Sequence, residues 1–435
     1  MSSSMSLGNA LNWLDSHINI ERNSHADFPS PSIVKVQDTL KMIGEPHKTY
    51  PVIHVTGTNG KGSTCRMITA LLLAHGLRVG TYVSPHLNRV NERILVDFEP
   101  ISDEDLVDEI STLKILEEHS GVILSWFELV TVAAFSHFDT VGIDVAVIEV
   151  GMGGTWDATN VIDGDVAVVT NVSLDHVEIL GPELSDIANE KSGIVKPLSS
   201  LVIGVDQKDL LEIFLSKPSA GTSVLGQDLH LRSNTQAIGG RVIAVRTKHA
   251  TYDEIFLPLF GPHQGNNAAL AVSAVEEFFG RALDIDVVKA AFERVSSPGR
   301  MEVISRAPLV VLDAAHNPAG MLSVRASLQS DFASVSRWHL VVSMLTGRDP
   351  KAMFLAIKND RIKSLSVAKT RSLRAMAVEE MAQAASEANL SSQNFETVSD
   401  ALRAAIKHCQ QDEGVLVCGS IYTVAEAREE VLKTE

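Results

Sequence analysis

The feature that most constrains the fold of this chain is a glycine-rich segment between an apolar run and an apolar helical stretch. The segment spans residues 54–64 and reads HVTGTNGKGST, with the apolar run at 52–55 and the apolar stretch at 67–73. Glycines let backbone N–H groups converge on phosphate oxygens, while a lysine and a hydroxyl can reach the terminal phosphates and Mg²⁺. The usual spacing places glycine where Val55 stands, so the segment predicts a variant P-loop. The alternative is a glycine-rich turn with a chance lysine.

Short apolar runs alternate with helical stretches on both sides of this loop. The runs lie at 52–55, 79–83, 145–150, 166–170 and 201–205. Continuous apolar strands that alternate with helices indicate a parallel sheet covered on both faces. Between about 223 and 259 the pattern changes to short alternating segments at 229–231, 241–246 and 254–257, which predict a small antiparallel sheet. A helix is expected to follow at 267–279.

A segment of small residues, Ser296-Ser297-Pro298-Gly299, has the composition of a linker between domains. After it the alternation restarts, with apolar runs at 309–312, 339–344, 363–368 and 415–418. A chain of 435 residues is also too long for one compact core. We therefore predict an α/β fold with two domains. Residues 1–297 form a P-loop-type parallel sheet domain with a small antiparallel sheet, and residues 298–435 form a smaller Rossmann-like α/β domain.

Polar side chains follow several predicted strands at the point where each strand ends. Ser84 follows the run at 79–83, Glu149 lies in the run at 145–150, and His176 comes shortly after the run at 166–170. Ligands bind at the carboxyl ends of strands in open parallel sheets, so these side chains should share one crevice with Lys61. An acidic residue beside a P-loop is a candidate Mg²⁺ partner. Taken singly, Glu149 could face solvent and His176 could be a helix-start residue satisfied by its backbone.

The composition excludes several classes of function. The formal net charge of −17 argues against a nucleic-acid partner, because such proteins need a basic face. The most apolar window, 121–138, is interrupted by Glu128 and His137, so no membrane span is expected. Met1–Ser4 shows no secretion signal, and three cysteines without metal spacing fit a reducing cytoplasm. Anionic substrates would need local cations in this acidic chain, and the candidates are Lys61, Arg89, Arg93 and Arg300.

A series of separated motifs occurs in order and matches one family. The motifs are Gly57-Thr58-Asn59-Gly60-Lys61-Gly62-Ser63, Ser84-Pro85-His86, Glu149-Val150-Gly151-Met152-Gly153-Gly154, Asp157-Ala158-Thr159-Asn160, Leu174-Asp175-His176, Glu190-Lys191-Ser192-Gly193-Ile194, His263-Gln264, Asn267-Ala268-Ala269, Pro298-Gly299-Arg300 and Asp313-Ala314-Ala315-His316-Asn317-Pro318. On these motifs, the sequence resembles folylpolyglutamate synthase and dihydrofolate synthase of the Mur ligase superfamily, over roughly residues 33–419. Each motif alone is weak, whereas the ordered set is specific. One departure is Ala314, where the family often has glycine, and we expect a small local change there without loss of function.

The resemblance assigns roles to residues of these motifs. It implies that the catalytic residues are Lys61, Lys191 and His316. It implies that ATP is bound by Thr58, Asn59, Gly60, Lys61, Gly62, Ser63, Asn267, Arg300 and Asp313. It implies one Mg²⁺ held by Ser84 and Glu149 with help from Ser63, and a second held by His176 and Lys191. It implies that the substrate is bordered by Ser84, Pro85, His86, Arg89 and Asp157, although residues 89–93 could equally be a polar loop.

Lys191 and His316 each leave a choice open. The matching lysine of the family is carbamylated, which turns a cation that would repel Mg²⁺ into an anionic ligand. The alternative is that Lys191 is an ordinary helix lysine. His316 could act on an incoming amine or bind the nucleotide, and the sequence does not decide between them.

The reaction implied by the resemblance has two steps. A substrate carboxylate attacks the γ-phosphate of ATP to give an acyl phosphate, and the amine of L-glutamate then displaces phosphate to form an amide. The acceptor would be a folate, and the segment at 157–160 resembles that of bifunctional members, which also use dihydropteroate. The enzyme is expected to act as a monomer in the cytoplasm, with the linker at 296–299 as a hinge between the domains. Two alternatives are another Mur-type ligase and a P-loop kinase or nucleotide switch.

Overall fold

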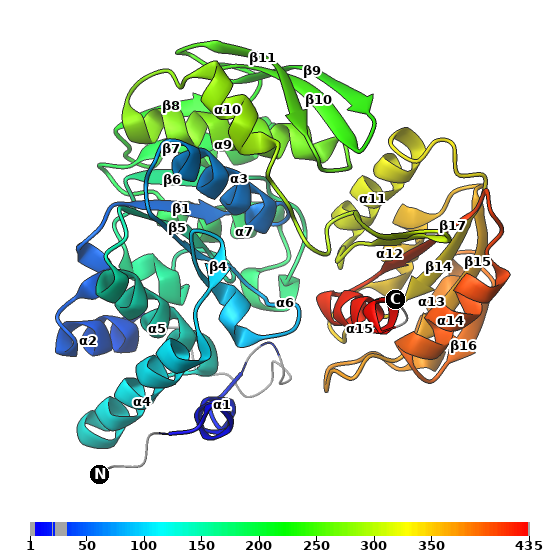
Figure 1. Ribbon diagram of the computed structural model, residues 1–435, viewed down its shortest axis with the longest axis horizontal. Helices are drawn as coiled ribbons and strands as arrows, with labels where there is room; N and C mark the ends of the chain where they lie inside the picture. The colour runs from blue at the N-terminus through cyan, green and yellow to red at the C-terminus, as the bar shows by residue number, and fades with distance from the viewer. Residues whose placement is uncertain (1–4, 20, 22–32, 434–435) are drawn as a thin grey trace.

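The computed structural model describes residues 5–19, 21 and 33–433, so the prediction for Met1–Ser4 lies outside the described residues. The chain forms two α/β bodies that lie side by side (Figure 1). The larger body, coloured blue to green, contains the predicted P-loop. The smaller body, coloured yellow to red, contains the chain after the linker. The predicted α/β class is confirmed.

The larger body is built on an eight-stranded sheet. The strand order is β4 (Glu99–Pro100), β3 (Ile94–Val96), β2 (Val79–Tyr82), β5 (Val145–Glu149), β1 (Val52–Thr56), β6 (Val166–Val169), β7 (Ser200–Ile203) and β8 (Gly221–Val224). All neighbours from β2 to β8 run parallel, and β3 and β4 add an antiparallel edge. The strands predicted from the apolar runs are therefore present and parallel.

Continuous burial explains why these strands have no alternating pattern. Every residue of β1 is buried, with Ile53 and Val55 packed toward α3 (Lys61–Ala74) and α9 (His263–Phe279). Val52 packs toward the opposite face, where α5 (Trp126–Val141) lies. Helices cover both faces of a parallel sheet, so both faces of each strand must be apolar. The other helices of this body are α1 (Leu7–Asp15), α2 (Val34–Met42), α4 (Asp103–Ser120), α6 (Val177–Leu180), α7 (Leu184–Lys191), α8 (Lys208–Leu215) and α10 (Ile285–Phe292).

A three-stranded antiparallel sheet lies at one end of the larger body (Figure 1). Its strand order is β11 (Thr251–Leu257), β10 (Gly240–Arg246) and β9 (His230–Ala237). Its apolar side chains, among them Ile243 and Ile255, join the core formed by α3 and α9. The antiparallel sheet is as predicted, except at its start. The segment from 221 to 224 forms β8, which pairs parallel to β7 in the large sheet instead.

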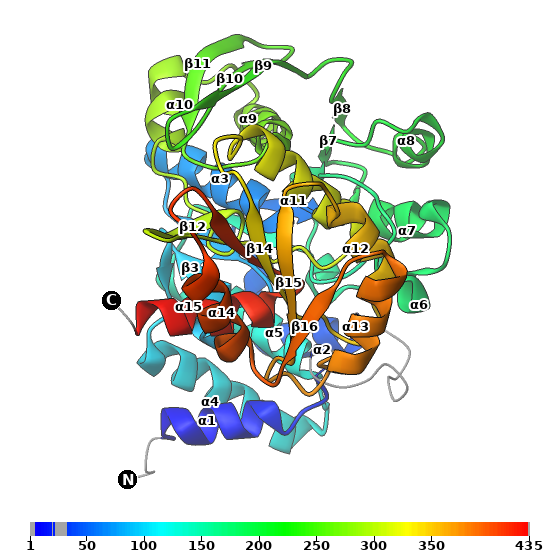
Figure 2. The same ribbon diagram turned by 90° about the vertical axis from the view of Figure 1, so that its right-hand side faces the viewer.

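The smaller body has a six-stranded sheet with helices on both faces (Figure 2). The strand order is β12 (Glu302–Arg306), β13 (Leu309–Leu312), β17 (Gly414–Cys418), β14 (Trp338–Val342), β15 (Ile362–Ala368) and β16 (Ser392–Phe395). One face packs against α11 (Pro318–Ser330), α12 (Pro350–Ile357) and α13 (Val378–Glu387). The other face packs against α14 (Val398–His408) and α15 (Ile421–Leu432).

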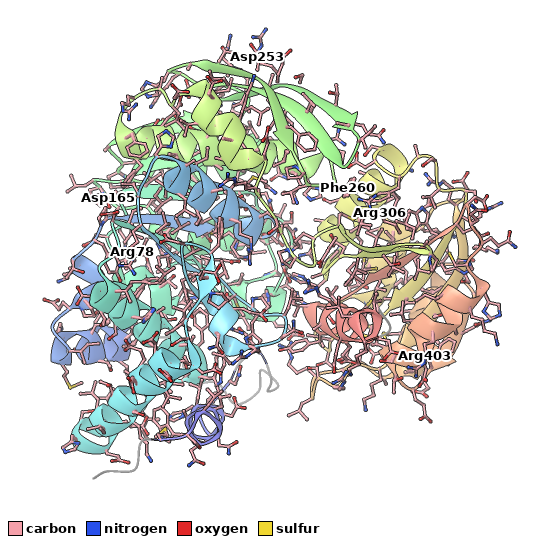
Figure 3. All side chains as sticks on the ribbon, in the orientation of Figure 1. Arg78, Asp165, Asp253, Phe260, Arg306 and Arg403 are labelled. Carbon is pink, nitrogen blue, oxygen red and sulfur yellow. The ribbon has the colours of Figure 1, made fainter. Side chains whose placement is uncertain are left out.

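The linker at 296–299 joins the two bodies, and none of the described sheets pairs strands across it. Two further contacts connect the bodies away from the linker. Arg241 of β10 forms a buried ion pair with Asp331, which follows α11. Phe260 lies between the bodies (Figure 3) and packs against the apolar core of the smaller one, with its ring centroid 4.9 Å from that of Phe332. The boundary after residue 297 stays a prediction. Among the described residues, no helix is long and apolar enough to cross a membrane.

Candidate active site

The predicted P-loop connects β1 to α3 and has the backbone that its glycines allow. Gly57 and Gly60 have φ angles of 147° and 85°, in the region that favours glycine. A Cβ on Gly60 would lie 2.7 Å from Oδ1 of Asn267, and one on Gly57 would lie 1.8 Å from Oγ1 of Thr170. Side chains at these positions would force α9 and the end of β6 away from the loop. The glycines therefore hold the loop against its neighbours as well as allowing its turn.

Lys61 curls over this loop. Its Nζ donates to the carbonyl oxygens of Gly57 at 3.0 Å and Thr58 at 3.3 Å. Burial lowers the pKa of Lys61, and nearby Arg300 lowers it further, while the carboxylate of Glu149 opposes the shift. A phosphate bound at this loop would give the Lys61 ammonium a charged partner in place of two carbonyl oxygens. The loop thus presents a cation and converging N–H groups to an anion.

Glu149 lies at the end of β5, beside the loop. Its side chain is buried and accepts the backbone N–H of Ser84 at 3.2 Å. Burial raises the pKa of Glu149, whereas Lys61 and the Ser84 N–H favour its charged form. Ser63, at the start of α3, has its Oγ 2.9 Å from that of Ser297 in the linker. The carboxyl ends of β1, β2 and β5 therefore meet at one place, as predicted.

Lys191 is the last residue of α7 and reaches the same loop from another side. Its Nζ is buried and donates to the carbonyl oxygen of Gly57 at 2.9 Å. Burial, and then the nearby charge of Lys61, hold the pKa of Lys191 well below its usual range.

His176 starts α6 with a left-handed backbone, at φ 50°. Its Nε2 lies 3.2 Å from Nη2 of Arg348 in the smaller body. Within the part of the chain that the structure describes, no group of three or more His, Cys, Asp or Glu side chains is arranged to hold a metal ion.

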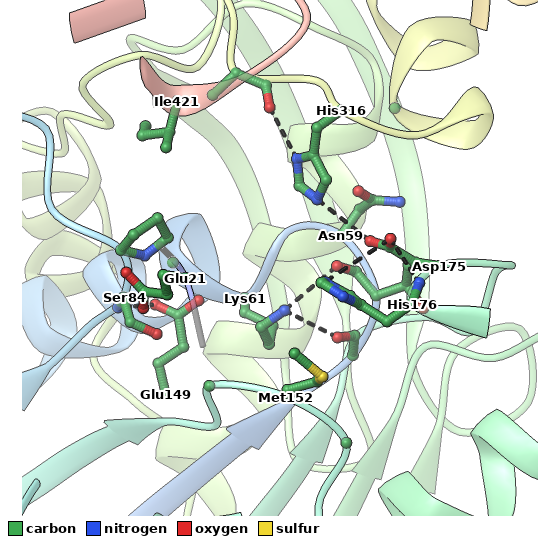
Figure 4. A pocket seen from close by; sticks show the side chains of 18 of the residues that line it. Glu21, Asn59, Lys61, Ser84, Glu149, Met152, Asp175, His176, His316 and Ile421 are labelled. Carbon is green, nitrogen blue, oxygen red and sulfur yellow. Dashed lines mark hydrogen bonds and ion pairs between the residues drawn. The ribbon is translucent and has the colours of Figure 1, made fainter. Parts of the chain in front are cut away.

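Asp175 joins the two bodies across the crevice (Figure 4). Its carboxylate is buried and pairs with Arg348, and it also lies 3.2 Å from Nε2 of His316 and 3.0 Å from Nδ2 of Asn317. Burial lowers the pKa of Arg348 to about 10 and that of His316 to about 4. Asn317 also bonds the side chain of Asn59 in the P-loop, at 3.1 Å. The segment after β13 therefore closes onto the loop.

A cavity of about 620 Å³ lies between these groups and is lined by both bodies. The predicted residues on its wall are Thr58, Asn59, Gly60, Lys61, Gly62, Ser63, Ser84, Pro85, Glu149, Asp157, His176, Lys191, Asn267, Arg300, Asp313 and His316. The wall also carries apolar side chains, among them Ile18, Ile123, Leu124 and Phe127. The cavity therefore offers both charged and apolar surface to a ligand.

Comparison with known proteins decides the family. Residues 55–275 match the Mur ligase middle domain, and residues 299–421 match the Mur ligase glutamate ligase domain. A dihydrofolate synthase/folylpolyglutamate synthase of Mycobacterium tuberculosis is 37% identical over 439 residues, covering 92% of this chain and 89% of its own.

The chain belongs to the Mur ligase family.

Solved structures of Mur ligases agree with this assignment. The Mycobacterium tuberculosis folylpolyglutamate synthase complexed with ADP has a TM-score of 0.90 at 35% identity, with 98% of each chain covered. A bifunctional folylpolyglutamate synthase/dihydrofolate synthase from Yersinia pestis, complexed with AMPPNP and a manganese ion, has a TM-score of 0.85 at 27% identity, also with 98% of each chain covered. The family resemblance predicted from the motifs is confirmed.

Two predicted substrate residues of this Mur ligase lie away from the described cavity wall. Arg89 is exposed and pairs with Asp103, and His86 accepts a hydrogen bond from Nε of Arg93 at 2.8 Å. The chain turns away from the cavity after Pro85, because residues 90–93 form a short 3₁₀ turn. Arg93, one of the cations singled out, is fully buried in an ion pair with Glu21. Ala314 stands where the family often has glycine. It is buried, and its backbone is not in the left-handed region that favours glycine.

Sequence reasoning missed three residues of the cavity region in this Mur ligase. Asp175 and Asn317 stand in motifs that were recognised, beside the residues chosen from them. Arg348 lies outside every motif, in the turn that follows β14. Ligands bind at the carboxyl ends of parallel strands, and that turn follows the carboxyl end of a strand in the second sheet.

Proposed function

We infer that this chain is an ATP-dependent ligase that adds L-glutamate to folates through an acyl phosphate. The observation that carries this inference is the cavity itself. One wall is a P-loop with Lys61 and Glu149, the opposite wall brings Asp313 and His316 from the second body, and the whole chain is a Mur ligase. The ADP and AMPPNP bound by its relatives support ATP as the nucleotide that this chain binds.

The chemistry needs two displacements. In the first, a carboxylate oxygen of the folate attacks the γ-phosphorus of ATP, the bond to the β-phosphate oxygen breaks, and ADP leaves. In the second, the neutral amine nitrogen of glutamate attacks the acyl carbon, the bond to the phosphate oxygen breaks, and the nitrogen loses one of its two protons, so that the amide keeps one N–H. Both steps bring anions together, so Lys61 and the loop N–H groups must neutralise charge. Orientation in the closed cavity contributes further, by on the order of 7–11 kcal/mol in favourable cases.

The residues beside the P-loop fit a divalent cation. Glu149 is a buried carboxylate within reach of the loop, and the hydroxyls of Ser63 and Ser84 belong to the same wall. Mg²⁺ prefers oxygen ligands and usually takes only one or two from carboxylates, the rest coming from phosphate and water. When bound here it would neutralise phosphate charge. The manganese ion of the Yersinia pestis relative supports a metal in this family.

We propose that a second metal is held by His176 and a carbamylated Lys191. Carbon dioxide adds only to a neutral amine, and burial holds the pKa of Lys191 well below its usual range. A solvent-exposed lysine would be neutral in fewer than about one molecule in a thousand at pH 7. Addition of carbon dioxide to the neutral amine, with loss of a proton, would give a buried anion facing the P-loop. The environment of Lys191 therefore fits the modification.

The rest of the cavity supports folate and dihydropteroate as acceptors. Ile18, Ile123 and Phe127 make an apolar wall that suits a flat ring, and Asp157 is a buried carboxylate on the same cavity. Both halves of the cavity come from one chain, which supports action as a monomer. We propose that the chain uses both acceptors, in line with the names of its relatives.

Glutamate-dependent release of phosphate tests this function. With ATP, Mg²⁺ and a folate present, a ligase releases phosphate much faster once L-glutamate is added, because the amine consumes the acyl phosphate. A P-loop kinase or nucleotide switch would turn over ATP at a rate indifferent to glutamate. Equal rates with and without glutamate would therefore reject the ligase assignment.

Replacement of His316 by alanine is expected to lower turnover by roughly 100-fold and to leave the fold intact. His316 lies on the cavity wall, and its imidazole is neutral near pH 7 because burial lowers its pKa to about 4. Steady-state kinetics and a thermal melt would measure the two effects. His408→Ala, on the exposed end of α14, is the matched control. An unchanged rate in His316→Ala would remove this residue from the site.

Nucleotide and substrate together are expected to make the molecule more compact. Ser297 of the linker bonds Ser63 at the start of α3, so the linker is in contact with the loop that binds phosphate. We propose that the segment at 296–299 is the hinge by which the smaller body closes and excludes water. Small-angle scattering with and without ligands would measure this change. Identical profiles would contradict the hinge.

A further inference from the structure

The carboxylate of Asp175 is the meeting point of the two bodies at the cavity. Asp175 belongs to the larger body, in the loop between β6 and α6, and is 7% exposed. Three side chains of the smaller body converge on it, and they are Arg348, His316 and Asn317. Figure 4 shows the contact with His316 across the cavity from Lys61. A single side chain of one body thus engages two separate turns of the other.

Those two turns follow strands of the second sheet that are separated by one strand, β17. His316 and Asn317 lie after β13, and Arg348 lies after β14. Asp175 also accepts its neighbour's backbone N–H, from His176, at 2.9 Å. His176 has a left-handed backbone and faces Arg348. The carboxylate therefore shapes its own loop at the same time as it engages the opposite body.

The bodies remain joined without this contact. Arg241 and Asp331 form a buried ion pair between them, and Phe260 packs into the core of the smaller body. Both lie away from the cavity wall, near the three-stranded sheet. The contact at Asp175 is consequently not required to hold the bodies together. It lies where the smaller body covers the P-loop, beside the bond between Asn317 and Asn59.

We propose that Asp175 is a positioning residue for amide formation, which holds His316 and Arg348 over the acyl phosphate and keeps water away from it. The proposal rests on the proposed ligase function. The first displacement uses Lys61 and Glu149 of the larger body, while Arg300 and Asp313 of the smaller body lie on the same cavity wall. The second displacement needs the smaller body in place, both to receive the amine and to exclude water. Loss of the carboxylate should therefore affect the second displacement more than the first.

The test compares phosphate release with amide formation in Asp175→Asn. In the native enzyme the two are equal, since each acyl phosphate is captured by glutamate. In the variant, amide formation is expected to fall by about 10–100-fold while phosphate release falls less, because water captures the exposed acyl phosphate. Asp175→Glu, which keeps the charge, is expected to bring the ratio of phosphate to amide back toward one. A variant that merely unfolds would lose both products in equal proportion.

Asp331→Asn is the matched control, because it breaks the other buried ion pair between the bodies. It is expected to lower the melting temperature and to leave the ratio of phosphate to amide at one. Arg348→Gln provides a second variant, in case Asp175→Asn does not fold, and is expected to release excess phosphate. A ratio of one in both folded Asp175→Asn and Arg348→Gln would overturn the proposal, as would the same excess in Asp331→Asn. Glutamate-independent turnover of the native enzyme would instead reject the ligase function itself.

Discussion

Replacement of Lys61 by alanine is expected to lower the rate of glutamate-dependent phosphate release by about 1,000-fold. Lys61 supplies the positive charge of the loop, and its Nζ already lies within the loop, bonded to the carbonyl oxygens of Gly57 and Thr58. Both displacements develop negative charge on phosphate oxygens, so a fixed cation in a poorly solvated site contributes more to the transition states than it would in water. The measurement is steady-state phosphate release with every substrate saturating.

The matched control for this prediction is Lys208→Ala, which removes a lysine from the exposed first turn of α8. Its rate should equal that of the native enzyme. Thermal melts should show that Lys61→Ala keeps its fold, because its charged end lies at the cavity wall and not in an apolar core. Normal turnover in a folded Lys61→Ala variant would reject the P-loop as the phosphate site.

Replacement of Lys191 by alanine is expected to lower turnover by about 100–1,000-fold, and added acetate should restore part of the loss. The proposed carbamate is an anion at the end of α7, and alanine would leave a space next to Gly57 that a small carboxylate can enter. An ordinary structural lysine would give no such rescue, because an anion cannot replace a cation. Activity titrated against acetate, with chloride at equal ionic strength, measures the effect.

Lys196→Ala is the control for Lys191. Lys196 is half-buried five residues further on, and its Nζ donates to the carbonyl oxygen of Asn160 at 3.5 Å. Neither its loss nor added acetate should change the rate greatly. A labelled-bicarbonate spectrum of the native enzyme adds a direct readout, because a carbamate carbon has its own resonance. Failure of acetate to restore Lys191→Ala, with no carbamate signal, would reject the modification.

The parallel sheets were predictable because burial on both faces leaves a continuous apolar run in the sequence. β1 and β5 are buried throughout and mostly apolar, and among their polar residues Glu149 lines the cavity, whereas His54 and Thr56 bond other buried groups. The edge strands were not predicted, since they lack that constraint. β4 has two exposed residues, and β12 and β16 are only partly buried, so their sequences resemble loops.

The larger body's share of the cavity was predictable for a related reason. Strand ends lie at fixed places in a parallel sheet, so Ser84, Glu149 and His176 could be brought together from the sequence. Contacts between the bodies could not be predicted from the sequence, because they depend on how one sheet is placed against the other. Asp175 and Arg348 lie far apart in the chain and carry no shared pattern. Arg89 and Arg93 show the same limit, since only the fold reveals that Arg89 pairs with Asp103 away from the cavity wall and that Arg93 pairs with Glu21, which lines it.

The central claim is that this chain joins L-glutamate to a pterin-bearing carboxylate with ATP. The most direct measurement supplies ATP, Mg²⁺ and L-glutamate with either dihydropteroate or tetrahydrofolate, in parallel, and weighs the products by mass spectrometry. The account predicts that each acceptor gains one glutamyl residue while ADP and phosphate appear in equal amounts. Consumption of ATP with no glutamate added to either acceptor would contradict it.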